Sequence, residues 1–171
     1  MNAETRRRRI LEHLSQAAAP VSATVLAGLF SVSRQVIVGD IALLRAAGED
    51  ITATPRGYVL STEHSGARRT VAVQHRLEDT ERELCIFVDQ GVTVEDVIVE
   101  HHIYGQLIGQ LQLSSRYDVG QFIERMNSGS ASALSSLTDG IHLHTLRCPD
   151  DAAFERACAA LDAAGFLLKQ E

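Results

Sequence analysis

The sequence predicts an α+β protein of two domains, and three observations lead to this class. Residues 1–62 contain three amphipathic helical stretches followed by two short β-prone runs. From residue 70 onward, short strand-like apolar runs are interleaved with helical stretches. The run STEHSGARR between them is polar and contains Gly66, which is typical of a linker. We therefore expect a helical domain with a terminal hairpin at 1–62, a linker at 63–69, and an α/β sandwich at 70–171.

The composition is that of an ordinary folded protein. Of 171 residues, 45% are hydrophobic and 22% are charged, which excludes disordered and fibrous classes. No run approaches the roughly 18 apolar residues of a membrane span, and the arginines at 6–9 are not followed by the apolar region of a secretion signal. The three cysteines lack CxxC spacing, so neither a disulfide scaffold nor a zinc ribbon is indicated. We expect a cytoplasmic protein without a membrane partner.

The net charge of −6 hides an asymmetry between the two predicted domains. Residues 1–62 contain seven arginines and five acidic residues, and the remainder contains nine basic and seventeen acidic residues. The first domain is therefore basic by two charges and the second is acidic by eight. A small basic module joined to an acidic one is typical of a DNA reader attached to a sensor or dimerisation domain. Chance fluctuation is the alternative explanation of the same counts.

The helices of the first domain can be assigned in order along the chain. The apolar residues of 4–16 form a helical stripe behind the arginine run, and Pro20 ends that region. Ser22 is well placed as the N-cap of a short second helix, because its hydroxyl can accept an orphan amide. Ser33 is predicted to cap a third helix that stays apolar up to Gly48.

The β-prone runs 51–54 and 57–60 flank Pro55-Arg56, which predicts a two-stranded hairpin. Three helices followed by a hairpin describe a winged helix-turn-helix, in which the third helix enters the major groove of DNA. Side chains at the start of that helix meet base edges, and an Arg can pair with guanine or a Gln with adenine. The predicted DNA-binding residues are Ser33, Arg34 and Gln35 on the third helix and Arg56 at the wing.

The remaining arginines of the first domain are better placed for phosphates, which position a protein on DNA without reading sequence. They are the run Arg6 to Arg9 and Arg45. The segments RRRRILEHL, VSATVLAGLFSVSRQVIVGDIALLRAAG and ITATPRGYVL resemble the helix-turn-helix of bacterial repressors such as the N-terminal domain of the biotin repressor. This resemblance covers about the first 60 residues and implies DNA binding. The alternative is a small helical domain that mediates protein contacts.

The second domain alternates strands and helices, as in an α/β sandwich whose helices cover one face of a sheet. The sequence does not reveal how the strands are connected. The expected strands are 70–75, 94–101, 107–113, 140–146 and 166–168, and the expected helices are 79–90, 118–127 and 151–164.

A His-Leu-His run lies on the fourth predicted strand of this domain. Side chains on a strand alternate between its faces, so His142 and His144 project together while Leu143 faces the other way. His75 at a strand end and Glu83 on the following helix can add a nitrogen and a carboxylate. Three imidazoles and one carboxylate suit Ni, Zn, Fe or Mn. The alternative is an exposed pair of histidines or hydrogen-bonded core histidines.

The segments HRLEDTERELCIFVDQG, VEHHIYGQL and SLTDGIHLHTL resemble the three histidine-containing motifs of the 3H domain. Joined to a helix-turn-helix, that regulatory domain is found in niacin-responsive repressors of NAD biosynthesis and niacin uptake. The resemblance implies one divalent metal per subunit, held by His75, Glu83, His142 and His144. It also implies nicotinate as effector, for which we expect contacts from His101 and Tyr104. The sequence departs from the family at His102, which stands where the middle motif usually has proline.

The resemblance therefore implies a repressor that binds double-stranded operator DNA as a homodimer, with nicotinate as co-repressor. Two alternatives belong to other classes. The metal itself could be the signal, without an organic effector, or the cluster could be the centre of a metal-dependent enzyme. Against the enzyme, no HExxH, Walker or GxGxxG pattern occurs in the sequence. We expect a regulator and not an enzyme.

Overall fold

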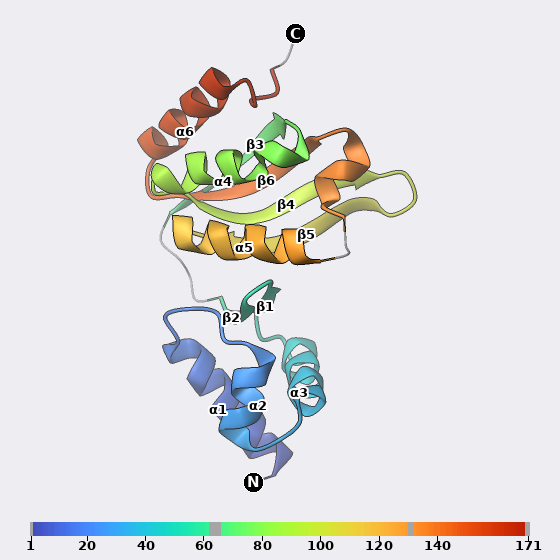
Figure 1. The fold of residues 1–171 in the computed structure, drawn as a ribbon. Helices are drawn as coiled ribbons and strands as arrows, with labels where there is room; N and C mark the ends of the chain where they lie inside the picture. The colour runs from blue at the N-terminus through green and yellow to red at the C-terminus, as the bar shows by residue number, and fades with distance from the viewer. Residues whose placement is uncertain (1, 62–65, 130–131, 170–171) are drawn as a thin grey trace. The chain divides into compact units, whose positions relative to one another are not determined.

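The structure is a computed structural model that describes residues 2–61, 66–129 and 132–169. Its contacts divide the chain into two compact units, residues 1–64 and 65–171 (Figure 1). The first unit contains α1 (Ala3–Gln16), α2 (Ala23–Phe30), α3 (Arg34–Ala46), β1 (Ile51–Thr54) and β2 (Gly57–Leu60). This is the predicted order of three helices and a hairpin.

Short polar side chains set the start of each helix in the first unit. Ser22 Oγ accepts a hydrogen bond from the amide of Val25, and Ser33 Oγ accepts one from the amide of Val36. Both predicted N-caps are confirmed. Ser31 ends α2 in the left-handed conformation, with φ of 53°, and produces the sharp turn before α3. The helix-turn-helix geometry therefore follows from local sequence.

The three helices and the hairpin pack around one small apolar core. Its fully buried members come from all three helices and from β1; they include Ile10, Leu26, Ile37, Ile41 and Ile51. The hairpin is fastened at Tyr58, whose backbone exchanges hydrogen bonds of 2.8 and 3.0 Å with that of Val21. Gly57 lies at this contact with φ of 141°, and a Cβ there would overlap the carbonyl group of Val21.

An ion pair joins the first helix to the third. Asp40 of α3 is buried, and it accepts hydrogen bonds of 2.6 and 3.2 Å from the Arg6 guanidinium of α1. Arg7 lies 3.6 Å from the same carboxylate. The side chain of Arg6 is only 13% exposed. The prediction that Arg6 serves as a phosphate contact is therefore corrected: a buried carboxylate needs a partner, and Arg6 provides it.

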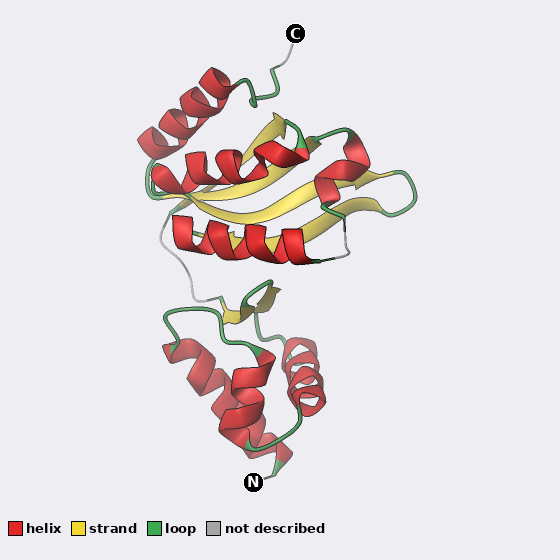
Figure 2. Cartoon of the chain, viewed as in Figure 1, coloured by secondary structure: helices red, strands yellow, loops and turns green. Residues whose placement is uncertain are grey.

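The second unit is a two-layer structure with an antiparallel sheet (Figure 2). Its strands lie in the order β3-β6-β4-β5, which sequence patterns did not reveal. Three α-helices pack on one face of the sheet, as predicted, and share an apolar core with the inward-facing strand residues. The elements are β3 (Ala67–Gln74), α4 (Thr80–Asp89), β4 (Thr93–His101), β5 (Gly105–Leu113), α5 (Arg116–Ser128), β6 (Ile141–Cys148) and α6 (Asp151–Ala164), with short 3-10 turns η1 (Leu77–Asp79) and η2 (Leu134–Thr138).

Two expectations for this unit differ from the structure. The expected linker was 63–69, but β3 already begins at Ala67 and pairs with β6 from its first residue; residues 62–65 lie outside the described part of the chain. The expected strand 166–168 is a single bridge between Leu167 and Val73. Two backbone hydrogen bonds accompany this bridge, from the amide of Gln74 to the carbonyl of Phe166 and from the amide of Leu168 to the carbonyl of Ala72, and Phe166 packs into the core.

No single helix among the described residues is long and apolar enough to cross a membrane. The pair formed by α2 and α3 meets the criteria of length and composition only when its two members are taken together, and it is bent by 104°.

Fastening of the hairpin can be tested with Gly57→Ala. We expect this variant to destabilise the first unit by more than about 1 kcal/mol, because the new Cβ meets backbone and the positive φ is strained for alanine. Gly28→Ala is the matched control, since nothing lies within 4 Å of a Cβ at that helical position; it should be neutral or stabilising by up to about 1 kcal/mol. Chemical denaturation followed by circular dichroism measures the free energy of unfolding of both variants. Equal stability of the two variants would contradict the role of the close contact between Gly57 and Val21.

Candidate metal centre and DNA-reading surface

Four buried side chains meet on the helix-covered face of the sheet. His142 and His144 project from β6 toward the helices, His75 follows the end of β3, and Glu83 comes from α4. The Glu83 carboxylate lies at the centre: its oxygens are 2.8 Å from His75 Nε2, 3.1 Å from His144 Nε2 and 3.4 Å from His142 Nε2. The structure therefore brings together all four residues that the sequence predicted as ligands.

The opposite ring nitrogen of each histidine is held by a backbone carbonyl. His75 Nδ1 lies 2.7 Å from the carbonyl oxygen of Arg76, and His142 Nδ1 lies 2.8 Å from that of Gly140. His144 Nδ1 lies 2.5 Å from that of Asp96. A carbonyl oxygen only accepts, so each Nδ1 carries the proton and the Nε2 of a neutral ring presents a lone pair. This is the arrangement of metal-binding histidines, whose second nitrogen donates to an outer partner.

A carboxylate and three neutral imidazoles contain no positive charge. With three Nε2 lone pairs turned toward a carboxylate, acceptor faces acceptor unless a proton or a cation lies between them. Accordingly, Glu83 Oε1 and His144 Nε2 are buried without a hydrogen-bond partner in the described part of the chain, although they are only 3.1 Å apart. Two ligand atoms that each lie about 2.1 Å from one ion are roughly 3.0–3.4 Å apart. The ligand atoms of His75, Glu83 and His142 all lie within 4.8 Å of one another, and His144 Nε2 lies beside the same carboxylate. The residues thus fit a divalent transition metal in donor type, and three of them also fit it in spacing.

Charge coupling inside the cluster shifts the pKa values of its members. Burial by itself lowers the pKa of His75 and His144, but the neighbouring Glu83 carboxylate outweighs it and raises both above the ordinary value. Burial by itself raises the pKa of Glu83, but the surrounding imidazoles, His144 foremost, hold it well below its usual range. Without a metal, protons therefore take the place of the missing positive charge.

A tight turn before β6 positions two of the histidines. Asp139 and Gly140 both adopt positive φ, of 50° and 85°. Gly140 packs so closely on the backbone of His75 that a Cβ would overlap the His75 carbonyl oxygen, and its own carbonyl orients His142. Sequence analysis did not single out this turn, although the Asp-Gly pair was a signal for it.

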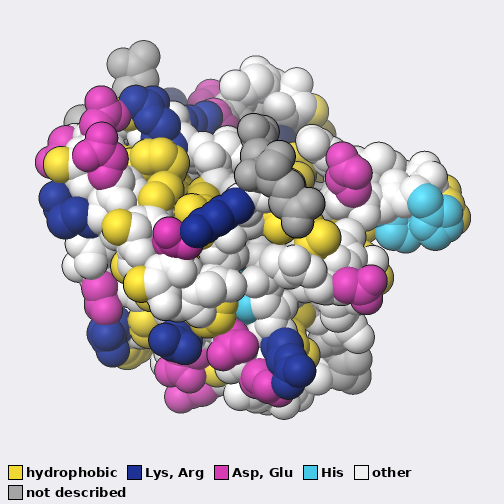
Figure 3. Space-filling view, turned by 90° about the horizontal axis from the view of Figure 1, so that it is seen from above, with side chains coloured by type: hydrophobic (Ala, Val, Ile, Leu, Met, Phe, Trp, Pro, Cys, Tyr) yellow, Lys and Arg dark blue, Asp and Glu magenta, His cyan; other side chains and the backbone are white. Residues whose placement is uncertain are grey.

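A cavity of about 460 Å³ opens beside the cluster. Arg76 and Leu77 line one side, Ser135 and Ser136 of η2 line another, and the backbone next to His75 forms part of the wall. The predicted effector residues lie elsewhere. His101 and Tyr104 belong to the β4-β5 hairpin, where their rings stack on each other and Tyr104 is 74% exposed. Histidine side chains colour a projection at the side of the molecule where this hairpin lies (Figure 3).

The exposed start of α3 carries the predicted base-reading residues. Arg34 and Gln35 are exposed in the first turn, and Ser33 uses its hydroxyl oxygen as the cap. Val36 is also exposed beside them, although it belongs to the apolar residues of this helix. An exposed methyl-bearing side chain here can contact a thymine methyl group.

The other predicted DNA contacts are only partly available. Arg56 lies in the turn of the hairpin but is half-buried, and its amide donates to Thr54 Oγ1. Arg45 Nε donates a hydrogen bond of 2.6 Å to the carbonyl oxygen of Ile51, and this bond connects α3 to the hairpin. Arg8 remains 72% exposed and free to reach phosphates, apart from a loose 3.9 Å pairing with Glu12.

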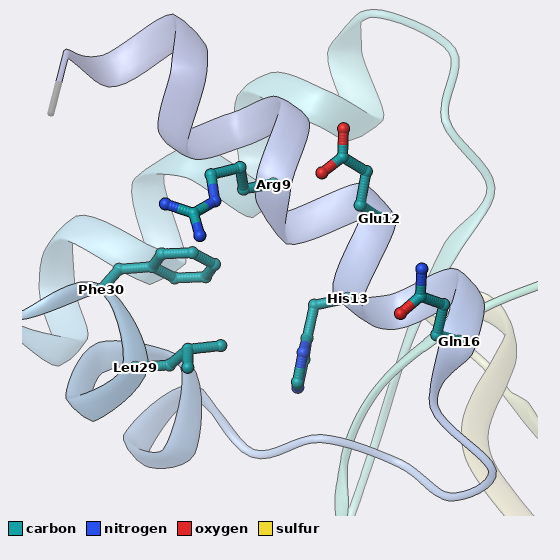
Figure 4. A pocket seen from close by; sticks show the side chains of 6 residues that line it. All are labelled: Arg9, Glu12, His13, Gln16, Leu29 and Phe30. Atoms are coloured by element: carbon teal, nitrogen blue, oxygen red, sulfur yellow. The ribbon is translucent and has the colours of Figure 1, made fainter.

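A second cavity, of about 250 Å³, lies between α1 and α2. Leu29 and Phe30 of α2 face Arg9 and His13 of α1 across it (Figure 4). Sequence patterns did not reveal this cavity, because its walls come from two separate helices.

Comparison with known proteins matches residues 68–170 to the 3H domain and residues 6–59 to an HTH domain. The transcription repressor NadR of Bacillus subtilis (strain 168) is 46% identical over 168 residues, which cover 96% of this chain and 93% of that protein. The chain belongs to the 3H-domain family of transcription repressors. The probable transcription repressor NiaR of Thermotoga maritima is 43% identical over 167 residues, which cover 98% of this chain and 95% of that protein. The resemblance to repressors that join a helix-turn-helix to a 3H domain is confirmed. This 3H protein is a regulator and not an enzyme.

The central role of the carboxylate can be tested with Glu83→Gln. An amide keeps the size of the side chain but removes its charge, so we expect affinity for Ni²⁺ or Zn²⁺ to fall by more than about 100-fold. Glu81→Gln is the matched control, because Glu81 lies on the exposed face of the same helix. Titration calorimetry and elemental analysis measure the effect; metal bound one per chain by Glu83→Gln would refute the site.

The shifted pKa values predict how the metal-free protein responds to pH. The raised imidazole pKa values contribute stability that is fully present below pH 6.5 and is lost as pH rises through the folded-state values. The lowered pKa of Glu83 contributes stability that is present above pH 4.5 and is lost as pH falls through its folded-state value. In chelator, the thermal midpoint of the 3H domain should be higher near pH 6 than near pH 8. Calorimetry should find this difference diminished in Glu83→Gln.

Proposed function

We propose that this protein is a homodimeric repressor that binds operator DNA in the cytoplasm, with nicotinate as its co-repressor and one divalent transition metal per subunit. Its targets are genes of NAD biosynthesis or niacin uptake. The observation that carries the proposal is the buried Glu83 carboxylate surrounded by three imidazoles, in a chain that also has a DNA-reading helix. The names of its relatives, NadR and NiaR, support the same role.

The metal site would be built by His75, Glu83, His142 and His144. A bound Ni, Zn, Fe or Mn ion supplies a Lewis acid that satisfies the converging lone pairs and can accept a further nitrogen or oxygen ligand. The three backbone carbonyls hold the rings in their binding orientation before the ion arrives. The protein thereby avoids the cost of ordering these side chains on binding.

We place nicotinate in the cavity beside His75 instead of at the β4-β5 hairpin. Arg76 can pair with the carboxylate of the ligand, and Leu77 offers an apolar surface to its ring. A charged partner for a carboxylate also favours nicotinate over the uncharged nicotinamide. The volume of about 460 Å³ lies within the usual range for small-molecule sites.

Effector and metal would share one residue, since His75 borders the cavity and its ring lies in the cluster. Binding of one ligand then fixes a group that the other needs, and the two affinities are linked. A coupling of about 1–3 kcal/mol between effector and DNA corresponds to a roughly 5- to 150-fold change in operator affinity. A homodimer fits this role because helix-turn-helix proteins read two half-sites one helical turn apart.

Fluorescence anisotropy of the metal-loaded protein tests the proposal. The probe is DNA from upstream of its own gene and of niacin-uptake genes, at fixed salt because phosphate contacts depend on it. We expect nicotinate to tighten specific binding by roughly 5- to 150-fold. Arg34→Ala should weaken binding to this DNA far more than to unrelated DNA.

Matched variants locate the effector. Arg76→Gln should lose most of the nicotinate response, and Arg125→Gln, on the exposed surface of α5, should retain it. Binding that ignores nicotinate but disappears in chelator would replace the proposal by a metal-responsive repressor. Absence of specific binding under every condition would overturn both.

A further inference from the structure

The pairing of β4 with β6 is irregular at one place, directly beside His144. The three residues 95–97 of β4 lie opposite only the two residues 144–145 of β6. The pairs that bound this irregular stretch are Val94 with Leu146 and Ile98 with Leu143. One extra residue in one of two paired strands is a β-bulge, which locally disrupts the ladder and redirects groups that regular pairing would use. The bulge therefore changes what the backbone can bind beside the histidine cluster.

Asp96 lies in this bulge and contacts β6 through both its side chain and its backbone. The carboxylate accepts a hydrogen bond of 2.9 Å from the amide of Thr145. In a regular antiparallel ladder, such an amide donates to a backbone carbonyl of the neighbouring strand. The carbonyl oxygen of Asp96 instead lies 2.5 Å from Nδ1 of His144. The side chain thus binds the strand amide, and the carbonyl of the same residue is left for the imidazole.

The bond at Nδ1 decides how the ring of His144 is presented to the cluster. Because a carbonyl oxygen only accepts, Nδ1 of the neutral ring carries the proton and Nε2 carries the lone pair. That Nε2 lies 3.1 Å from the Glu83 carboxylate. An outer hydrogen bond of this kind fixes the tautomer and the orientation of a metal-binding histidine. The place of the Asp96 carbonyl therefore determines whether this lone pair points toward a bound ion.

The carboxylate of Asp96 has a cost that regular pairing would avoid. Its residue is only 9% exposed, and burying a charged group is unfavourable unless it is hydrogen-bonded or paired. A regular ladder would satisfy the amide of Thr145 with a backbone carbonyl and would need no acidic residue. What the irregular arrangement adds is a backbone carbonyl directed at His144. Bulges next to functional sites commonly have such a role.

Asp96 also has a charge that acts on the same ring, but this effect is small. Burial lowers the pKa of His144, and Glu83 raises it by more; the hydrogen bond and the charge of Asp96 add less than either. The geometry of the hydrogen bonds is therefore the larger contribution of this residue.

We propose that Asp96 is a positioning residue of the metal centre: its carboxylate holds the amide of Thr145 and thereby keeps its own carbonyl in place to orient the ring of His144. The inference rests on the proposed metal site and adds a residue that contacts neither the metal nor the effector. Metal affinity depends on where the acceptor oxygen of this side chain lies, and not on its charge.

Three substitutions separate the position of that oxygen from its charge. Asp96→Asn keeps an acceptor oxygen in the same place and removes the charge. Asp96→Glu keeps the charge and moves the oxygen by one methylene group, and Asp96→Ala removes both. We expect Asp96→Glu and Asp96→Ala to bind Co²⁺ about 10- to 100-fold more weakly than wild type, and Asp96→Asn to stay within about threefold of it. Titration calorimetry of the full-length protein measures these affinities.

A second readout follows the ring itself in protein treated with chelator. In NMR spectra at pH 8, the Nδ1 proton of His144 should exchange slowly with water in wild type and Asp96→Asn, and rapidly in Asp96→Glu and Asp96→Ala. The Nδ1 proton of His142, which is held by the carbonyl of Gly140, is the internal reference and should not change. General destabilisation would affect both rings.

Asp118→Ala is the matched control for loss of a buried carboxylate. Asp118 accepts a hydrogen bond of 3.0 Å from the amide of Ser114, and it lies on α5, which provides no residue of the cluster. This variant should lose stability but keep its affinity for Co²⁺. Circular dichroism shows which variants are folded, and the comparison of Asp96→Asn with Asp96→Glu suffices if Asp96→Ala does not fold.

The outcomes separate this inference from the proposed function. Equal Co²⁺ affinity of wild type and Asp96→Glu would overturn the inference, whereas nicotinate-dependent operator binding would still support the repressor. Asp96→Asn that binds as weakly as Asp96→Ala would show that the charge acts, and would overturn positioning. A wild type that binds no Co²⁺ would refute the proposed metal site and the inference with it. Weak binding confined to Asp96→Glu and Asp96→Ala, with only the His144 signal changed, supports the inference.

Discussion

The interaction on which the 3H domain depends is the one between a buried carboxylate and three buried imidazoles. Glu83 is fully buried in α4, and an isolated charge in such a place is prohibitively costly. The imidazoles come from the end of β3 and from β6, so the same electrostatic requirement connects one helix and two neighbouring strands. A structural site of this kind makes the domain's packing dependent on what occupies its centre.

The helix-turn-helix domain is stabilised in a different way. Its core is small, and local devices define its geometry: serine caps at the starts of α2 and α3, and a left-handed Ser31 between the two helices. Arg6 and Asp40 then fix α1 against the recognition helix. Arg6 therefore stabilises the fold, and the number of arginines in the first domain overestimates how many can contact DNA.

Features that depend on local chemistry could be predicted from the sequence. The caps at Ser22 and Ser33 need only a hydroxyl before a helical pattern, and the common orientation of His142 and His144 needs only the two-residue period of a strand. Their places at a strand end and on the following helix made His75 and Glu83 candidates to join that pair, and the resemblance of the motifs implies the same four ligands. The two caps are confirmed, and the two histidines share a face of β6, because each of these features is decided by neighbours in the chain.

Features that depend on distant contacts could not be predicted. Nothing near Arg6 in the sequence indicates that its partner is Asp40, 34 residues away. The motif that contains His101 and Tyr104 marks them as candidate effector contacts but does not say where in the fold they lie. The structure places both residues on the β4-β5 hairpin, where Tyr104 is exposed. The strand order is equally hidden, because β6 inserts between β3 and β4 although it comes last in the sheet's sequence.

The alternation of β6 has a consequence for how this protein can change in evolution. Loss or gain of one residue within 141–148 would exchange the two faces of the strand, turning leucine toward the carboxylate and histidines toward the outer surface. Such a change would disrupt the histidine-bearing face and the opposite face of β6 at once, and no single compensating substitution could restore both faces. Point substitutions can adjust either face separately, whereas the length of this strand is effectively fixed.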